Sequence, residues 1–261
     1  MNSLIIDGRT AGLFSNLLHT IDNIKYCELY GYKPIIRWSD VIYTDGRNDI
    51  WNQYFESIND GIIEGQSEYS NMFKLKNYIL DDGLKSILYN IRESDTDDRT
   101  HRHDVHKIFD RYIIPVEKIR KQVDDFIEKN FTSDMLGVHV RGTDYGFDDF
   151  DSYFRNIDNN LEKHNMIYLA TDNEETIDKI KKRYGEKMCF FETERMKKYK
   201  DPVLCYTIKD KIKHAEDVIT EVYLLSKCNH LICINSNVPL TSLYINNNMS
   251  FDLIYRSKYG A

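Results

Sequence analysis

The 261-residue sequence lacks several features that would place it in a common class of protein. It has no excess of positive charge, since its formal net charge is −7 and its isoelectric point is near 5.6. A general nucleic-acid-binding protein presents a basic face, so this balance argues against nucleic acid as a partner, although one local basic group can still bind a polyphosphate. No stretch approaches 18 apolar residues, so we expect no membrane span.

Signals for secretion, disulfides and metal binding are also scarce. The first residues show no basic segment followed by a long apolar run, which argues against a signal peptide. The five cysteines show no Cys-x-x-Cys pair, and we expect a cytoplasmic protein with reduced thiols that serve mainly in packing. The cysteines are Cys27, Cys189, Cys205, Cys228 and Cys233. The charged stretch 94–100 is expected to be a solvated loop. The histidines that follow it, His101, His103 and His106, lack the apolar surroundings and the neighbouring carboxylate of a metal site, so we expect no metal there.

The first part of the chain has the pattern of a βαβ unit. Residues 3–6 and 34–38 are apolar enough for strands, and apolar residues at helical spacing follow Phe14, with Ser15 as the expected cap. The helix should end at Gly31, a typical C-terminal stop. The glycine-containing loop 8–16 has two interpretations, either a tight turn or a set of backbone amides that bind a phosphate or sugar.

The second part repeats the alternation of strands and helices. Strands are predicted at 136–140, 166–170, 188–191 and 230–234, with helices near 113–133, 152–164, 215–227 and after Pro239. Asp172 and Glu175 are expected to cap the helix after the second of these strands. We therefore predict an α/β fold of two facing Rossmann-like domains, residues 1–115 and 116–261, with the site in the cleft between them.

The segment 136–145 concentrates the candidate chemistry. Its alternating apolar residues predict a buried strand that ends in His139-Val-Arg141-Gly-Thr-Asp144. A guanidinium at a strand end, braced by a carboxylate, can bind a phosphate with two parallel hydrogen bonds. The alternative for Arg141 and Asp144 is a surface ion pair. His139 lies on the same side of the strand as Arg141 and is either a core histidine or a ligand-facing one.

Polar residues follow or flank other predicted strands of the same half, at Thr171, Asp172, Glu221 and Ser236. Each can also be interpreted as a cap or turn residue that has no role in binding. Their common position at the carboxyl edge of a parallel sheet, where α/β proteins bind ligands, makes them a candidate site together.

At these residues the sequence resembles a known family. His139-Val-Arg-Gly-Thr-Asp144, Tyr168–Asp172, Val218–Ser226 and Leu231–Ser236 look like the ordered motifs of the fucosyltransferase superfamily, and the α1,6-fucosyltransferases have the most similar pattern. The resemblance covers most of residues 110–245, and it is weaker at 12–31, where residues 12–19 look like the family's N-terminal donor loop and helix.

The resemblance implies a GT-B-like fold, GDP-fucose as donor, a glycan or glycolipid acceptor, inversion at the anomeric carbon, and no cofactor or metal. Arg141 would hold the β-phosphate, Asp144 would orient Arg141, and His139 and Glu221 would contact guanine. The remaining nucleotide-sugar contacts would come from Thr171, Asp172, Ser236, Gly12, Ser15 and Asn16.

The family places a catalytic base about ten residues after the first-motif histidine, which points to Asp149. Asp148 and Asp151 are the neighbouring alternatives, and all three acids could instead form a solvated loop. Gly142 stands where the family often has a second arginine, and Glu221 where the most similar relatives have aspartate. These departures keep two further hypotheses open: a transferase for another nucleotide sugar, and a sugar-nucleotide- or glycan-binding protein without turnover.

Overall fold

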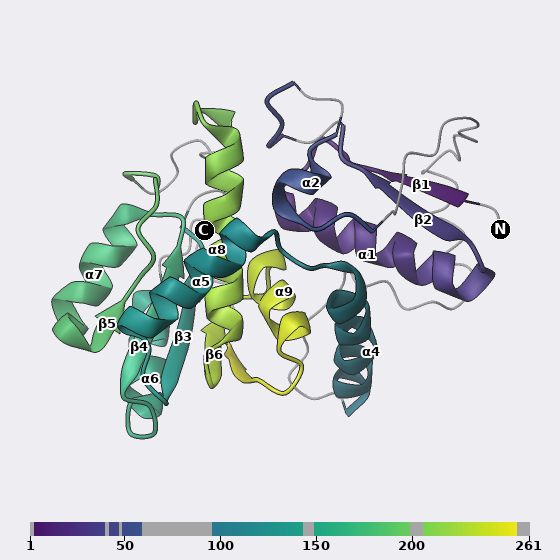
Figure 1. Ribbon diagram of the computed structural model, residues 1–261. Coiled ribbons are helices and arrows are strands. Elements are labelled where there is room, and N and C mark those ends of the chain that lie inside the picture. The colour runs from purple at the N-terminus through teal and green to yellow at the C-terminus, as the bar shows by residue number, and fades with distance from the viewer. Residues whose placement is uncertain are drawn as a thin grey trace, which may run out of the picture.

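The computed structural model describes residues 3–39, 42–46, 49–58, 96–142, 149–198 and 206–254. Two parallel sheets lie on opposite sides of the molecule in Figure 1, with α4, α8 and α9 between them. The elements of the first sheet and its surroundings are β1 (Ser3–Asp7), α1 (Leu13–Tyr30), β2 (Lys33–Arg37), α2 (Trp51–Tyr54), α4 (Thr96–Tyr112) and α5 (Glu117–Asn130).

The second sheet holds five strands in the order β5-β4-β3-β6-β7, all parallel. Its elements are β3 (Met135–Val140), α6 (Phe150–Asn160), β4 (Met166–Thr171), α7 (Glu174–Tyr184), the 3-10 turn η1 (Gly185–Lys187), β5 (Met188–Cys189), α8 (Lys211–Ser226), β6 (His230–Cys233), α9 (Asn237–Ile245) and β7 (Ser250–Leu253).

The predicted βαβ unit at the N-terminus is confirmed. β1 and β2 pair in parallel from Ser3↔Lys33 to Asp7↔Arg37. α1 ends at Gly31, whose φ of 72° lies in the left-handed region that glycine adopts without strain. The prediction that Ser15 caps the helix is wrong, because α1 begins at Leu13 with Gly12 as its N-cap and Ser15 lies within the first turn.

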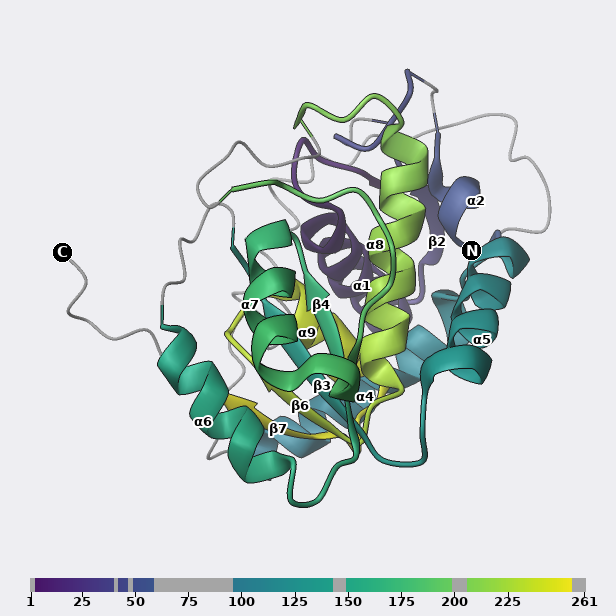
Figure 2. The ribbon, with the colours of Figure 1, turned by 90° about the vertical axis from the view of Figure 1, so that its left-hand side faces the viewer.

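Helices cover both faces of the five-stranded sheet. Figure 2 shows α6 on one side of the strands and α5 and α8 on the other. Because successive side chains of a strand point to opposite faces, β3 contributes to both sides of the sheet. Leu136, Val138 and Val140 pack in the cluster that includes residues of α6 and α7. Gly137 faces Cys228, at the end of α8: a Cβ at this position would lie 3.2 Å from the Cβ and Sγ of Cys228. His139, two residues further along β3, lies on this same α8 side.

One hydrophobic cluster links the two sheets. It runs from α1 through α4, α5, α8 and α9 to the α8 side of the five-stranded sheet. The placement of the domain boundary between residues 115 and 116 stays a prediction.

Four other local features differ from what the sequence predicted. Residues 96–100 belong to α4 and not to a loop, because the charged start of this helix is continued by Val105, Ile108 and Phe109, which are buried. α7 is capped by Asn173, whose side chain accepts a hydrogen bond from the backbone N–H of Thr176, so the predicted Asp172–Glu175 capping pair is wrong. The strand β7 was not expected, and the strand at 188–191 is shortened to Met188–Cys189.

Candidate functional site

The site lies where the order of strands in the large sheet changes direction. The chain runs from β3 outward through β4 to β5, and then continues with β6 and β7 on the other side of β3. The carboxyl ends of β3 and β6 therefore form the switch point at which open α/β sheets bind ligands. His139 lies near the carboxyl end of β3, Arg141 follows the strand directly, and Asn237 begins the helix after β6.

His139 is buried at this edge. Burial lowers the pKa of its imidazole to about 3, and the positive charge of the neighbouring Arg141 adds a smaller effect in the same direction. The ring is therefore neutral at physiological pH. Among the described residues Nδ1 has no hydrogen-bond partner, although it is shielded from solvent. A buried polar atom of this kind favours a ligand-facing role for His139 over a satisfied core histidine.

The backbone after Arg141 is held by an acid from the next strand. The N–H of Gly142 donates a 2.7 Å hydrogen bond to Oδ1 of Asp172, which follows β4. This bond explains why Asp172 does not cap α7, and it fixes the turn that presents Arg141. Thr143, Asp144 and Asp148 lie outside the described residues, so the expected brace between Arg141 and Asp144 stays a prediction.

The N-terminus of α1 faces the same space. No side chain of the described part of the chain caps it at Gly12, so its first backbone N–H groups are available to an anion. Asn16 shapes the preceding loop, because its side chain accepts from the N–H of Arg9 and donates to the carbonyl oxygens of Arg9 and Ala11. These bonds, with that from the N–H of Ala11 to the carbonyl oxygen of Arg9, close residues 9–11 into a tight turn and give Asn16 a structural contact. The part of the loop that lines the ligand space is Gly12–Ser15, at the start of α1.

These residues enclose a cavity of about 300 Å³. Of the predicted binding residues, Gly12, Ser15, His139, Arg141, Thr171, Asp172 and Glu221 line it, whereas Asn16 and Ser236 do not. The structure thus brings together seven residues that are distributed over more than 200 positions of the sequence. The cavity is also lined by residues that the sequence did not single out, among them Tyr43, Thr193, Arg195, Tyr206, His214 and Asn237.

Arg195 is the most important of the residues that the sequence analysis missed. Its guanidinium forms a buried ion pair with Glu221, with Nη2 2.6 Å from Oε1. Burial raises the pKa of Glu221 to about 7, even though the charge and hydrogen bond of Arg195 lower it. Nothing in the local pattern Glu-Thr-Glu-Arg195 sets this arginine apart from the many surface charges of the chain.

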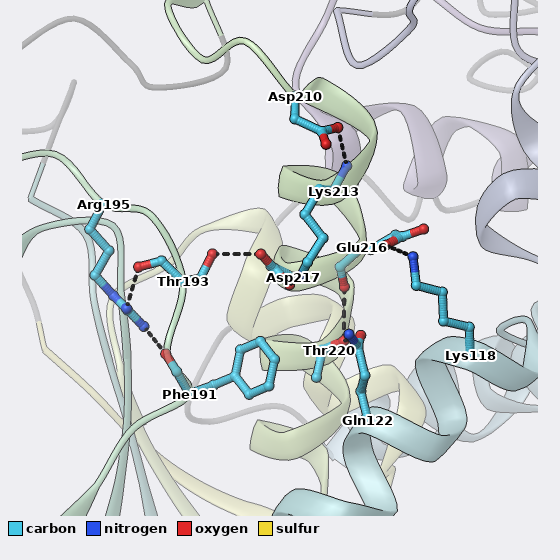
Figure 3. Close-up of polar contacts among 10 residues, drawn as sticks. All are labelled: Lys118, Gln122, Phe191, Thr193, Arg195, Asp210, Lys213, Glu216, Asp217 and Thr220. Atoms are coloured by element: carbon cyan, nitrogen blue, oxygen red, sulfur yellow. Dashed lines mark hydrogen bonds and ion pairs between the residues drawn. The ribbon is translucent and has the colours of Figure 1, made fainter.

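Figure 3 shows how polar contacts hold the cavity wall to α8. Thr193 Oγ1 donates a 2.9 Å hydrogen bond to Asp217, which also pairs with Lys213 one turn earlier on the helix. On the far side of α8, Lys118 of α5 pairs with Glu216 at 2.5 Å. The segment after β5, α8 and α5 are therefore joined by polar contacts.

The predicted base residues lie at the start of α6. Asp149 is the N-cap: its Oδ1 accepts from the N–H of Ser152 at 3.0 Å and its Oδ2 accepts from Ser152 Oγ at 2.5 Å. These hydrogen bonds lower the pKa of Asp149, so it is ionised at neutral pH. Asp151 lies in the first turn of α6 and is exposed. Neither carboxylate lines the cavity formed by the described residues.

Ser236 and the α4 histidines have contacts of another kind. Ser236 is the N-cap of α9, although its side chain does not cap the helix. His101, His103 and His106 contact Tyr244, Asn247 and Tyr244 respectively.

Within the described ranges, no group of three or more histidine, cysteine or acidic side chains is arranged to hold a metal ion. No helix in the same ranges is both long and apolar enough to span a membrane.

Solved fucosyltransferases have a similar structure. NodZ α1,6-fucosyltransferase soaked with GDP-fucose is 14% identical over 94% of this chain and 92% of that protein, with a TM-score of 0.62. NodZ from Bradyrhizobium is 15% identical over 94% and 92%, with a TM-score of 0.60. A mutant of Arabidopsis thaliana FUT1 in complex with GDP is 12% identical over 99% and 71%, with a TM-score of 0.59.

POFUT1 in complex with GDP is 9% identical over 97% of this chain and 98% of that protein, with a TM-score of 0.56. No protein-family model and no curated protein matches the sequence. The resemblance expected from the motifs is confirmed at the level of the fold. The chain has the GT-B-like α/β fold that the fucosyltransferases NodZ, FUT1 and POFUT1 share.

Proposed function

We propose that the protein is an inverting, metal-independent glycosyltransferase that moves fucose from GDP-fucose to a glycan or glycolipid acceptor. One observation carries the proposal: His139 and Arg141 line a cavity together with the uncapped N-terminus of α1. This cavity lies at the switch point of a fold that NodZ and POFUT1 share, in structures that hold GDP-fucose or GDP.

The diphosphate of the donor lies against Arg141 and the first turn of α1. A guanidinium offers two parallel N–H groups to a phosphate, and the amides that follow Gly12 add further donors and a favourable helix dipole. As the bond from the anomeric carbon to the β-phosphate oxygen breaks, these donors stabilise the negative charge on the leaving GDP. That electrostatic role is the one that a metal ion has in other transferases.

The guanine base lies between His139 and Glu221. A neutral imidazole can accept or donate one hydrogen bond at each nitrogen, depending on the tautomer. The ionised carboxylate of Glu221 accepts from the N–H groups on the edge of guanine. Thr171 and Asp172 lie at the end of β4, where they complete the nucleotide side of the cavity.

The acceptor hydroxyl attacks the anomeric carbon from the side opposite to the leaving GDP. Its oxygen forms the new bond, the electrons of the old bond leave with GDP, and the hydroxyl proton passes to a carboxylate base. We assign that base to Asp149, with Asp148 and Asp151 as the neighbouring alternatives. The lowered pKa of Asp149 keeps it ionised and ready to accept a proton, although it also makes it a weaker base.

The second candidate function is binding of a sugar nucleotide or glycan without turnover. Two observations favour it: both carboxylate oxygens of Asp149 are occupied by Ser152, and Gly142 replaces the second arginine of the family motif. A third possibility is the same reaction with a different nucleotide sugar.

Calorimetry with GDP, ADP and UDP, followed by an acceptor-array assay with GDP-fucose in the presence and absence of EDTA, distinguishes these functions. We expect binding of GDP over the other nucleotides and EDTA-resistant release of GDP with a glycan acceptor. Tight GDP binding without transfer to any acceptor would favour the binding protein. An absence of affinity for guanine nucleotides would exclude the fucosyltransferase.

A further inference from the structure

The buried ion pair between Arg195 and Glu221 joins two segments that are remote in sequence. Arg195 belongs to the segment between β5 and α8, and Glu221 lies in the third turn of α8. Their side chains are 3% and 10% exposed. Both residues line the cavity, so the pair forms part of the wall that faces the ligand.

Arg195 is immobilised by four hydrogen bonds. Its Nε donates to the carbonyl oxygen of Thr171 at 2.9 Å, and its Nη1 donates to that of Thr193 at 3.0 Å. Its Nη2 donates to the carbonyl oxygen of Phe191 and to Oε1 of Glu221, both at 2.6 Å. Figure 3 shows the guanidinium reaching the backbone of Phe191 and Thr193. These bonds use four of the five N–H groups and leave the guanidinium little freedom to rotate.

Most of the groups around Glu221 oppose the ionisation of its carboxyl group. Burial opposes its ionisation, and two acids add to this effect, Asp217 one turn earlier on α8 and Asp172 at the end of β4. The buried hydroxyl of Tyr168, on β4, is also close enough to interact with the carboxylate. Among the described groups that act on Glu221, Arg195 is the one that favours the charged form. Without it, a buried carboxyl group in these surroundings would be protonated at neutral pH.

We propose that Arg195 is a positioning residue that makes the cavity selective for guanine. It holds Oε1 of Glu221, so the other carboxylate oxygen is left to accept hydrogen bonds from the base. The edge of guanine carries N–H donors at N1 and N2, whereas adenine presents an acceptor at N1. An ionised, oriented carboxylate therefore favours guanine and disfavours adenine. This inference rests on the proposed function, because it assumes that the base of the nucleotide lies against Glu221.

The test measures the binding of GDP and ADP to the full chain by calorimetry between pH 6 and 9. Arg195→Lys keeps the charge but cannot make four fixed bonds, and Arg195→Gln removes the charge. Loss of a charge-assisted contact corresponds to about 10- to 100-fold in affinity. We expect GDP affinity to fall by this factor in both variants while ADP affinity stays the same, so that the ratio of the two affinities falls.

The pH dependence separates positioning from simple structural support. In the wild type, GDP affinity should rise with pH through about 7, the pKa of Glu221, because only the carboxylate accepts from guanine. In Arg195→Gln this rise should move to higher pH, since the carboxyl group loses its counter-charge. Glu221→Gln should abolish the rise altogether, and it provides a readout that does not depend on whether the arginine variants fold.

Arg183→Gln is the matched control. Arg183 pairs with Asp158 over the same 2.6 Å, but the two side chains are 48% and 44% exposed and lie on α7 and α6, outside the cavity. It should leave both affinities unchanged. An unchanged ratio of GDP to ADP affinity in both Arg195 variants, with GDP bound by the wild type, would overturn this inference alone. If the wild-type protein binds no GDP, the proposed function fails and the inference fails with it.

Discussion

Replacement of His139 by leucine should stabilise the free protein and weaken its binding of GDP. His139 is 6% exposed at the carboxyl end of β3, and its Nδ1 has no partner among the described residues. A buried polar atom without a hydrogen bond costs about 1–3 kcal/mol. Leucine removes that atom and places an apolar side chain in this buried position, so the free energy of unfolding should rise by about the same amount.

The expected shift is large enough to measure. For a domain of 150–250 residues, 1 kcal/mol corresponds to about 2–4 °C in melting temperature. His139→Leu should therefore melt about 2–12 °C higher than the wild type at pH 7. The affinity for GDP should fall about 5- to 150-fold, because the ring no longer bonds to the base.

The loss of stability at low pH gives a second test, which is independent of GDP binding. The pKa of His139 is about 3 in the folded protein, and that of an unfolded histidine is near 6.5. Below pH 6.5 the unfolded state therefore binds one proton more, and the wild type loses stability as the pH falls towards 3. The loss is about 1.4 kcal/mol per pH unit, or about 2 kcal/mol at pH 5, and the leucine variant should not show it.

Thermal melting at pH 7, urea unfolding at pH 7 and pH 5, and calorimetry of GDP binding measure these effects. His139→Asn is the control, since it retains a polar atom near the position of Nδ1 and should not gain stability. If His139→Leu is less stable than the wild type at both pH values and binds GDP equally well, His139 is a structural residue and the reasoning is refuted.

Three further changes test two other residues of the site and the packing of the sheet behind it. Arg141→Lys keeps the charge but loses the fork, so GDP release from GDP-fucose should slow about 10²- to 10³-fold with an unchanged circular dichroism spectrum; full activity would contradict the phosphate role. Asp149→Asn still caps α6, so the melting temperature should stay the same while turnover falls about 10²- to 10⁴-fold; a loss only in Asp151→Asn would move the base to that residue. Gly137→Ala would bring a Cβ to 3.2 Å from Cys228 and should cost about 1–3 kcal/mol in urea unfolding; an unchanged midpoint would show that the core yields there.

Local sequence patterns predicted most of the elements that carry the site. Alternating apolar residues identified β3, and helical spacing with a terminal glycine identified α1 as far as Gly31. The helix α4 and the strand β7 were missed, because both are stabilised by contacts with residues that are remote in sequence. β7 pairs with β6 from Ser250↔His230 onward, and Arg102 of α4 donates to the carbonyl oxygen of Met249. Pairing of this kind depends on packing and leaves little trace in a local pattern.

The sequence by itself determined which residues arrive at the edge of the sheet. The carboxyl ends of parallel strands meet at one edge, so the order of the strands was enough to bring Arg141 and Asp172 near each other. The tertiary structure alone decided what each side chain contacts there. It turned Asp172 towards the N–H of Gly142 and placed Arg195 against Glu221, 26 residues away. Such contacts depend on how α8 packs against the sheet, because a hydrogen bond requires positions accurate to a few tenths of an ångström.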